Sequence, residues 1–580
     1  MNEHGWPLHE FRYDQIALSP GIHQEQLDQT HGVLMGLSED SLLRPYRLRV
    51  GLPAPGCDLG GWYSSEAFGA ETFGQWMSAL SRYYAITGDG ETRAKVHRLV
   101  NQLSDTIEPS GKLFGDSTIT KGAAYPYDKL VCGLIDAHRF TDHPFALKVL
   151  AALTAAATPH LPPEVPTDDL LGAHESYTIP ENQFIAWQLG GDPAHLRMAK
   201  AYIHHSFFDP LSQGQNVLAG RHAYSHVNAL CSAAKAFLVL GEEKYLHAAK
   251  HGFDFIEEQS FATGGWGPNE AFVPNLGPSQ SDFPRIRTLG DSLAATHCHF
   301  ETCCGSYAHF KLARYLLRIT KASRYGDSME RVMYNTVLGA KELRQGGESF
   351  YNSNYHAHDA HKSYYDGYSG RFPTLWPCCS GTLPQVAADY RINIYFHDAK
   401  GVYVNLYVPS TLAWQQDNVR VSLSQSGSYP IEDVVNIVVT PEQARSFSLR
   451  LRIPSWTINP TISINGARVA ASVRPGTFAT LEREWRAGDR IELELPRQYQ
   501  LQAVDAEHPH MVALVYGPLV LFSIGAHPRR VTRQQLLTAR RHGSHNHEWR
   551  ATVADGELRL APFYSIRDEP YSTYLTVNDP

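Results

Sequence analysis

The sequence lacks any long apolar run, and its charge is close to balanced for its size. No segment approaches the ~20 consecutive apolar residues that a helix needs to cross a bilayer. The first residues, MNEHGWPLHEFRYDQ, lack the basic region and apolar stretch of a secretory signal. The formal net charge is −8, and the basic stretch Arg529–Arg541 is short enough to be a solvated face. We therefore expect a soluble, cytoplasmic protein that binds neither membranes nor nucleic acid.

Cysteine is also scarce, with eight residues in a chain of 580. Scattered thiols in a large chain fit a reducing compartment better than a disulfide framework. Four of them, however, form two adjacent pairs, Cys303-Cys304 and Cys378-Cys379. A lone cysteine is most often a small buried hydrophobic residue, but paired thiols near the carboxylate of Glu301 are typical of a zinc site. We expect Glu301, Cys303, Cys378 and Cys379 to bind one Zn²⁺, which would keep the thiols deprotonated.

Local geometry limits how these ligands can meet. Glu301 and Cys303 are two residues apart and would point to nearly opposite sides of a helix, so they must lie in a turn or an extended entry. The next segment, GSYAHFKLARYLLRIT, is a good helix, which places the motif at a helix N-terminus that favours thiolate. Cys378 and Cys379 need an irregular backbone, for which Pro377 provides a breaker. Other possible ligands adjoin the first motif: His297, Cys298, His299 and Cys304. A separate histidine-rich run, which we interpret as a polar loop, contains His356, His358 and His361.

A length of 580 residues exceeds what one hydrophobic core usually holds, so we expect two or three domains.

Helical hairpins recur along the first half of the chain. A unit of apolar helix, short polar turn and second helix repeats at roughly fifty residues. The five units are YYAITGDGETRAKVHRLV, AHRFTDHPFALKVLAAL, AWQLGGDPAHLRMAKAYI, AFLVLGEEKYLHAAKHGF and LLRITKASRYGDSMERVM. With a helical stretch at Glu25–Ser38, they favour a closed (α/α)6 barrel over residues 1–395, although an open solenoid has the same local signature.

After about residue 395 the periodicity changes from helical to alternating. Segments such as VYVNLYV and FSLRLRI place apolar residues at every second position, as in strands with one buried face. Asn465-Gly466 is a hairpin turn signal. We expect a β-sandwich domain over 396–500, followed over 501–580 by a second small β-domain or a continuation of the sandwich.

Five motifs follow one another between residues 299 and 496: HFETCC, YGDSMERVMYN, WPCCSGT, LRLRIPSW and EWRAGDRIELELP. Their content and order resemble the bacterial β-L-arabinofuranosidases of glycoside hydrolase family 127, and the resemblance spans most of the chain. The resemblance implies a catalytic (α/α)6 barrel followed by β-sandwich domains, in agreement with the periodicity. It also implies a retaining hydrolase that releases a terminal L-arabinofuranose or a related sugar from an oligosaccharide or glycoside.

The resemblance further assigns roles to individual residues. The family's zinc ligands correspond to Glu301, Cys303, Cys378 and Cys379, and its nucleophilic cysteine corresponds to Cys378. A zinc-held thiolate would replace the carboxylate that attacks the anomeric carbon in most retaining glycosidases. The stretch GGWGPNEAF supplies Glu270 as the acid/base. Without the resemblance, Glu270 would be interpreted as an ordinary loop carboxylate.

Five more residues are candidates for binding the sugar. By the resemblance, His222, Glu330 and Tyr351 line the pocket. Glu330 could otherwise be a solvated helix carboxylate, and Tyr351 a strand aromatic. Trp62 and Trp266 are candidate platforms for stacking on a sugar ring, although aromatic side chains are more often core residues.

The chain departs from the family pattern in three places. It has CCSGT where the family commonly has CCPPN, it has Asp128 and Lys129 where the family has a histidine-bearing helix start, and the gap from Glu270 to Glu301 is longer. Two other function classes share the same features. One is another carbohydrate-active enzyme on this toroid, such as a lyase; the other is a non-catalytic glycan-binding protein with structural zinc. Metal removal separates them, because a structural site loses stability whereas a catalytic site loses turnover in folded protein.

Overall fold

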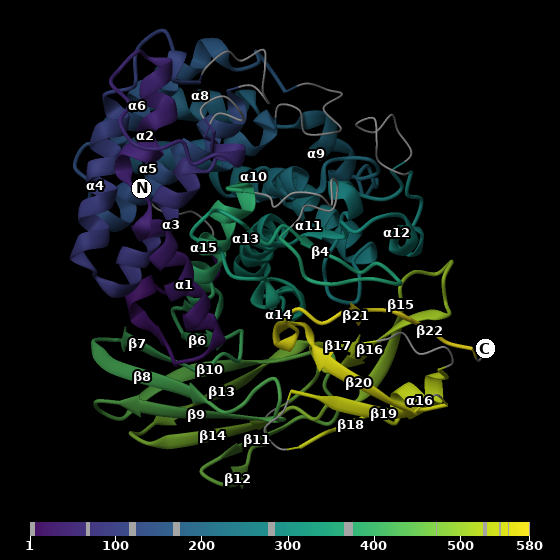
Figure 1. Cartoon of the computed structure of the whole chain (residues 1–580). Helices are drawn as coiled ribbons and strands as arrows, with labels where there is room; N and C mark the ends of the chain where they lie inside the picture. Colours follow the sequence, from purple (N-terminus) through teal and green to yellow (C-terminus); the bar gives the residue numbers. More distant parts are fainter. Residues whose placement is uncertain are drawn as a thin grey trace.

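The computed structural model describes residues 6–64, 70–114, 123–165, 175–275, 285–364, 375–470, 472–525, 531–543, 547–554 and 556–578. A helical body occupies the upper part of the molecule, and β-sheets lie below it (Figure 1). The helical body is built mainly from the first two thirds of the chain and the sheets mainly from the last third. This order confirms the predicted fold class.

Six helices form the inner ring of the helical body. They are α3 (Phe73–Thr87), α5 (Ala124–Thr141), α7 (Ile179–Gly190), α10 (Ala223–Leu240), α13 (Thr302–Thr320) and α15 (Cys378–Asp389). Each packs against the next, and α15 packs back against α3. This closure confirms the (α/α)6 barrel and excludes the open solenoid. At one close contact, a Cβ on Gly74 of α3 would lie 1.9 Å from the Lys129 carbonyl oxygen of α5, so this approach requires glycine.

The remaining helices surround this ring and include the second helix of every predicted hairpin. They are α1 (Ile22–Gly36), α2 (Glu39–Arg49), α4 (Gly90–Ser104), α6 (Ala146–Ala157), α8 (Pro193–Ala201), α9 (His205–Ser212), α11 (Glu243–Glu258), α12 (Leu289–Ala295) and α14 (Arg324–Asn335). The turn after α10 shows why the chain reverses: Gly241 has a left-handed φ of 75° and ends the helix there. Among the described helices, none combines the length and apolarity needed to cross a membrane.

Two sheets form the β-sandwich below the ring. Their strand orders are β1-β5-β6-β10-β13 and β12-β11-β14-β9-β8-β7-β2. The strands that follow the ring are β5 (Tyr395–Asp398), β6 (Gly401–Val404), β7 (Ser410–Gln416), β8 (Val419–Ser426), β9 (Val434–Pro441), β10 (Arg445–Ile453), β11 (Thr461–Ile464), β12 (Ala467–Arg468), β13 (Thr477–Trp485) and β14 (Asp489–Glu494). The segment FSLRLRI falls on β10, whereas only the first three residues of VYVNLYV lie on a strand, β6, which pairs with β10 in parallel.

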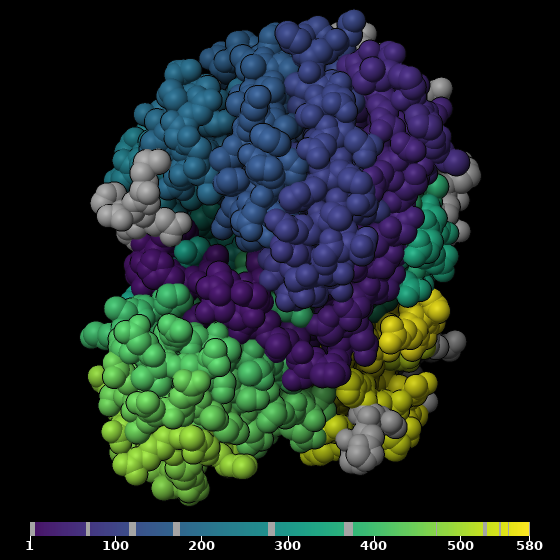
Figure 2. All heavy atoms as spheres, turned by 90° about the vertical axis from the view of Figure 1, so that its left-hand side faces the viewer, coloured from purple at the N-terminus to yellow at the C-terminus, as the bar shows by residue number. Residues whose placement is uncertain are grey.

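The N-terminus also contributes to the sandwich. Strand β1 (His9–Glu10) pairs with β5, and β2 (Ile16–Leu18) pairs with β7. Figure 2 shows this segment in purple between the helices and the green sandwich. These strands are two and three residues long, too short for an alternating pattern to be recognised in the sequence. The first residues of the chain therefore join the ring to the β-region.

The last part of the chain forms a third sheet with the order β15-β16-β17-β20-β19-β18, to which β21 and β22 also pair. Its elements are β15 (Tyr499–Ala503), β16 (Met511–Tyr516), β17 (Leu519–Ile524), α16 (Arg533–Leu537), β18 (Arg540–Arg541), β19 (Trp549–Val553), β20 (Gly556–Pro562), β21 (Tyr571–Ser572) and β22 (Leu575–Thr576). Phe522 and Phe563 of this part share a buried cluster with Phe261 and Phe350 of the helical body. The sheet therefore buttresses the loops that carry the motifs described next.

Candidate active site

Four potential metal ligands meet at one end of the ring. The ligand atoms of Glu301, Cys304, Cys378 and Cys379 all lie within 4.8 Å of one another, and all four residues are buried. Cys304 Sγ is 3.5 Å from Cys379 Sγ, and Cys378 Sγ is 3.2 Å from Glu301 Oε1. We call this set the thiol group. Three sulfur atoms and one carboxylate oxygen in a dry site match the ligand set and number of a tetrahedral zinc site.

Two helix N-termini position the thiol group. Glu301 ends strand β3 (Phe300–Glu301), which pairs with β4 (Asn352–Ser353), and it caps α13. This confirms that the motif lies at the entry of a helix. Cys378 and Cys379, in contrast, are the first two residues of α15, so the expected irregular backbone at the pair is wrong. The irregularity precedes them: Trp376 has a left-handed φ of 51°. The first-turn N–H groups of a helix favour a thiolate there.

Cys304, and not Cys303, supplies the third sulfur of the thiol group. Cys303 Sγ instead contacts the Phe350 carbonyl oxygen at 3.3 Å. Successive residues of a helix point about 100° apart, and here the Cys304 side chain is the one directed at the other three ligands. Cys303 nevertheless neighbours Cys379, because its side chain helps to raise the pKa of that thiol. In the structure Cys304 takes the place expected for Cys303, and the assignment of Cys303 as a zinc ligand stays a prediction.

The electrostatics of the thiol group fit a bound cation. Burial raises the pKa of Glu301 and of Cys304 well above their ordinary values, and that of Cys379 to about 12. Burial in the protein alone therefore disfavours the charged forms of these groups. Within the described residues, Glu301 Oε2 is buried without a hydrogen-bond partner. A buried carboxylate oxygen without a hydrogen-bond partner, beside three thiols, fits a metal site. A bound cation would coordinate the oxygen and stabilise the thiolates.

Glu270 lies beside the thiol group. Its carboxylate, that of Glu301 and the His222 ring lie within 4.8 Å of one another. Tyr351 Oη donates to Glu270 Oε1 at 2.7 Å, and His222 Nε2 is 3.2 Å from Glu270 Oε2. Glu270 and the preceding Asn269 both have left-handed φ angles, 58° and 53°. Consecutive left-handed residues other than glycine are uncommon and indicate that the fold forces this carboxylate towards the site.

His222 is held in one orientation by the start of α10. It is the N-cap of that helix, and its Nδ1 accepts from the backbone N–H of Ser225 at 3.3 Å. A neutral imidazole that accepts at Nδ1 carries its proton on Nε2, so Nε2–H donates to Glu270. The Tyr351 hydroxyl and the His222 imidazole thus each form a hydrogen bond to one of the two carboxylate oxygens of Glu270.

Comparison with known families decides the family of the chain. The model of the catalytic domain of family GH127, beta-L-arabinofuranosidase, matches residues 15–391, and that of the GH127 middle domain matches residues 401–497. The chain belongs to glycoside hydrolase family 127. It is therefore a glycoside hydrolase, and the resemblance noted in the sequence is confirmed.

Solved structures show that the whole fold is shared. BT3674, a GH127 beta-arabinofuranosidase, is 16% identical with a TM-score of 0.77, covering 100% of this chain and 99% of its own. Ara127N, a GH127 beta-L-arabinofuranosidase from Geobacillus stearothermophilus T6, is 16% identical with a TM-score of 0.74, covering 97% and 100%. A third glycoside hydrolase is 17% identical with a TM-score of 0.73, covering 100% and 98%. A search of curated proteins found no match.

The two tryptophans that were candidate sugar platforms differ in position. In this family 127 enzyme, the partly exposed Trp62 ring lies 6.0 Å from the ring of Tyr351 and so borders the site. Trp266 is 1% exposed and stacks on Phe272, while its Nε1 donates to His309. Trp266 is therefore packed in the core, and its assignment to sugar binding stays a prediction that this burial does not favour.

Glu330 holds the ring on the sandwich and makes no described contact with the thiol group. Its carboxylate accepts from Arg452 Nη2 at 2.7 Å, from Trp456 Nε1 at 3.1 Å and from the hydroxyl of Tyr429. All three partners belong to the β-region. Glu330 and Arg452 are almost completely buried. These contacts support a structural role for Glu330, and its assignment to sugar binding stays a prediction.

We expect Glu330→Ala to lower the free energy of unfolding by about 3 to 5 kcal/mol, because it leaves the Arg452 guanidinium buried without its main carboxylate partner. Denaturant unfolding measures the change. Glu442→Ala is the matched control, since Glu442 forms an exposed ion pair 3.8 Å from Arg420 and should alter stability little. If Glu330 bound substrate, the variant would instead keep its stability and lose affinity.

The sequence carries no signal for two tyrosines near the thiol group. Burial, and then the nearby Cys378 and Cys304, raise the pKa of the Tyr125 and Tyr224 hydroxyls, which places both tyrosines close to the thiol group. Lys129 Nζ lies 4.6 Å above the Tyr125 ring and 5.9 Å above that of Tyr224. The departure from the family at Asp128-Lys129 therefore lies beside these two tyrosines. Its signal in the sequence was the replacement of an expected histidine.

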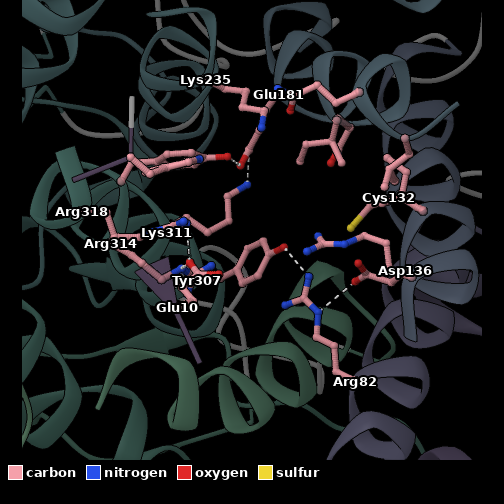
Figure 3. A pocket seen from close by; sticks show the side chains of 18 of the residues that line it. Glu10, Arg82, Cys132, Asp136, Glu181, Lys235, Tyr307, Lys311, Arg314 and Arg318 are labelled. Atoms are coloured by element: carbon pink, nitrogen blue, oxygen red, sulfur yellow. Dashed lines mark hydrogen bonds and ion pairs between the residues drawn. The ribbon is translucent and has the colours of Figure 1, made fainter. Parts of the chain in front are cut away.

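A separate charged pocket of about 450 Å³ lies at the opposite end of the inner helices. Figure 3 shows Arg82 between Asp136 and Tyr307, and Lys311 directed at Glu181. Arg82 also bonds Asp389, the last residue of α15, whereas Cys378 is the first. At about 1.5 Å per residue, the pocket lies about 16 Å along the helix from the thiol group. The side chains that line this pocket mostly pair with one another, so we interpret them as a structural network of charges at this end of the barrel.

Proposed function

We propose that this enzyme releases a terminal L-arabinofuranosyl residue from a glycoside with retention of anomeric configuration, using Cys378 as nucleophile and Glu270 as acid/base. The observation that carries the proposal is the placement of Glu270, gripped by Tyr351 and His222, beside the buried thiol group. The sugar is proposed from the names of the matching family and of its solved members. The thiol group is the proposed zinc site.

Cys378 is the sulfur best placed to attack. It is 5% exposed, whereas Cys379 is 1% and Cys304 is 0% exposed, so it is the thiol nearest to the open side of the group. The pKa of Cys378 is raised overall: a hydrogen bond with Cys304 lowers it, whereas Cys379, burial and the nearby Glu270 carboxylate raise it, which supports a position of Glu270 close to this sulfur. Zinc bound by Glu301, Cys304, Cys378 and Cys379 would supply the charge that keeps the sulfur as a thiolate. The N-terminus of α15 adds to that effect.

Glu270 serves both halves of a retaining hydrolysis. Protonated Glu270 gives its proton to the leaving oxygen while the Cys378 sulfur bonds to the anomeric carbon. The carboxylate then takes a proton from water, whose oxygen displaces the sulfur and returns it as thiolate. Tyr351 and His222 hold the carboxylate in one orientation during both steps, and both Glu270 and Cys378 lie within 4.8 Å of the Glu301 carboxylate. Trp62 borders the side from which a sugar would enter.

The acid/base role predicts a dependence on the leaving group. We expect Glu270→Gln to lower turnover by about 10²- to 10⁴-fold for glycosides with poor leaving groups and much less for aryl glycosides with acidic ones, because only the former need a proton at bond cleavage. The dependence of turnover on the pKa of the leaving group, measured across a series of aryl β-L-arabinofuranosides, tests this expectation. Glu348→Gln, which removes a partly exposed carboxylate paired with Arg344, is the control and should keep the wild-type dependence on the leaving group. An equal loss for all leaving groups would remove Glu270 from this role.

A further inference from the structure

His297, His356 and Asp359 form a second donor group, apart from the thiol group. Their ligand atoms all lie within 4.8 Å of one another. His356 Nδ1 is 2.6 Å and His297 Nδ1 is 3.7 Å from Asp359 Oδ1. The two imidazole rings stack with their centroids 4.2 Å apart. Two imidazoles and one carboxylate on a partly exposed surface leave room for water to complete a coordination shell.

The hydrogen bonds of this group are compatible with metal coordination by both imidazoles. The Asn354 amide nitrogen is 3.3 Å from His297 Nδ1, and the His358 backbone N–H donates to His356 Nδ1 at 3.4 Å. In the neutral rings that accept these bonds, each Nδ1 has its lone pair beside Asp359 Oδ1. A cation between the three atoms would be coordinated by all of them, in place of the ion pairs that protonated imidazoles form with this carboxylate.

Hydrogen bonds within the protein hold the backbone around this donor group in place without a bound ion. The Ala357 N–H donates to the Leu293 carbonyl at 2.8 Å, which joins the loop to α12. The His356 ring also hydrogen-bonds to the backbone of Ala294. A second hydrogen bond of this kind orients the ring of a metal-binding histidine. Preorganised donors lower the cost of ordering a site on binding.

We propose that His297, His356 and Asp359 bind a second divalent transition-metal ion of the zinc class. Two imidazole nitrogens and a carboxylate oxygen are suitable ligands for such ions, whereas the thiol group would bind its ion mainly through sulfur. The ion would link the loop at 354–359 to the segment that supports the Glu270 turn. Within that segment, the Asn269 N–H donates to the Cys298 carbonyl at 2.8 Å, and Thr296 Oγ1 bonds the Asn269 side chain. The site is independent of the proposed catalytic role of the thiol group.

Calorimetric titration of the metal-free full chain with Zn²⁺, checked by elemental analysis, tests this site. We expect two ions per chain. Asp359→Asn, an isosteric change on an exposed side chain, and His356→Ala should each raise the Kd of one ion at least ~10-fold and leave the other unchanged. His361→Ala is the matched control, because His361 is an exposed histidine of the same loop whose Nδ1 bonds the Asp359 carbonyl instead.

The two metal sites fail separately in this experiment. Cys304→Ala should abolish the ion of the thiol group and keep the ion that Asp359→Asn weakens. One ion per chain that Asp359→Asn leaves unchanged would overturn the second site and leave the thiol group standing. Loss of an ion in His361→Ala as well would show that the loop binds zinc adventitiously and would also overturn the proposal.

Discussion

Cys378→Ser is expected to lower kcat by at least ~10⁴-fold for every leaving group, while the protein remains folded. Serine preserves the size of the side chain, but its hydroxyl is a far weaker nucleophile than a thiolate, and loss of a catalytic nucleophile typically costs several orders of magnitude. Steady-state kinetics on an aryl β-L-arabinofuranoside measures the loss. Acidic leaving groups should not rescue the variant, in contrast to Glu270→Gln.

Two controls make this result specific. Cys132→Ser removes a thiol of α5 that lies outside the thiol group, with Sγ 3.8 Å from Ser78 Oγ, and should retain wild-type turnover. Zinc content of Cys378→Ser is measured in parallel, because Cys378 is also a proposed ligand. A variant that keeps zinc and loses turnover assigns the defect to the attacking atom. Substantial turnover in Cys378→Ser would exclude Cys378 as the nucleophile.

Removal of zinc is expected to abolish turnover by a similarly large factor and leave the barrel folded. The thiol group joins α13 and α15, which also pack directly on each other within a large apolar core, so the ring has other sources of stability. Activity should return when Zn²⁺ is added back. Circular dichroism and thermal unfolding of the chelated protein follow the fold. Unfolding that accompanies the loss of activity would instead indicate a structural zinc site.

Single variants distinguish the two neighbouring thiols of α13. Cys304→Ala should lose zinc and turnover, because its sulfur completes the thiol group. Cys303→Ala should retain both, because its sulfur faces the Phe350 carbonyl. Elemental analysis of both purified variants provides the comparison. The opposite pattern would restore Cys303 as the ligand.

Much of the fold could be predicted from the sequence because its signals are local. Helix periodicity, turn residues and the change to alternation gave the hairpins and the sandwich. Closure of the ring depends on α15 packing against α3, about three hundred residues apart in the chain, and is visible only in the structure. The N-terminal strands β1 and β2 were missed because their partners, β5 and β7, follow the ring.

The candidate site shows the same division between local and distant information. The motifs identified Glu270, Glu301 and the vicinal pair at Cys378, and the structure brings these residues together. The choice between Cys303 and Cys304 depends on the rotation of α13 about its axis, which no motif encodes. The contacts of Glu330 with the β-region could not be predicted, because its partner Arg452 lies 122 residues away in the chain.

Product stereochemistry tests the central claim most directly. The wild-type enzyme is incubated with an aryl β-L-arabinofuranoside, and the anomeric configuration of the released sugar is observed by NMR before it mutarotates. A single glycosyl–Cys378 intermediate followed by attack of water predicts that the first-formed product retains the configuration of the substrate. Release of the inverted anomer would contradict the account and leave Cys378 with a purely structural, metal-binding role.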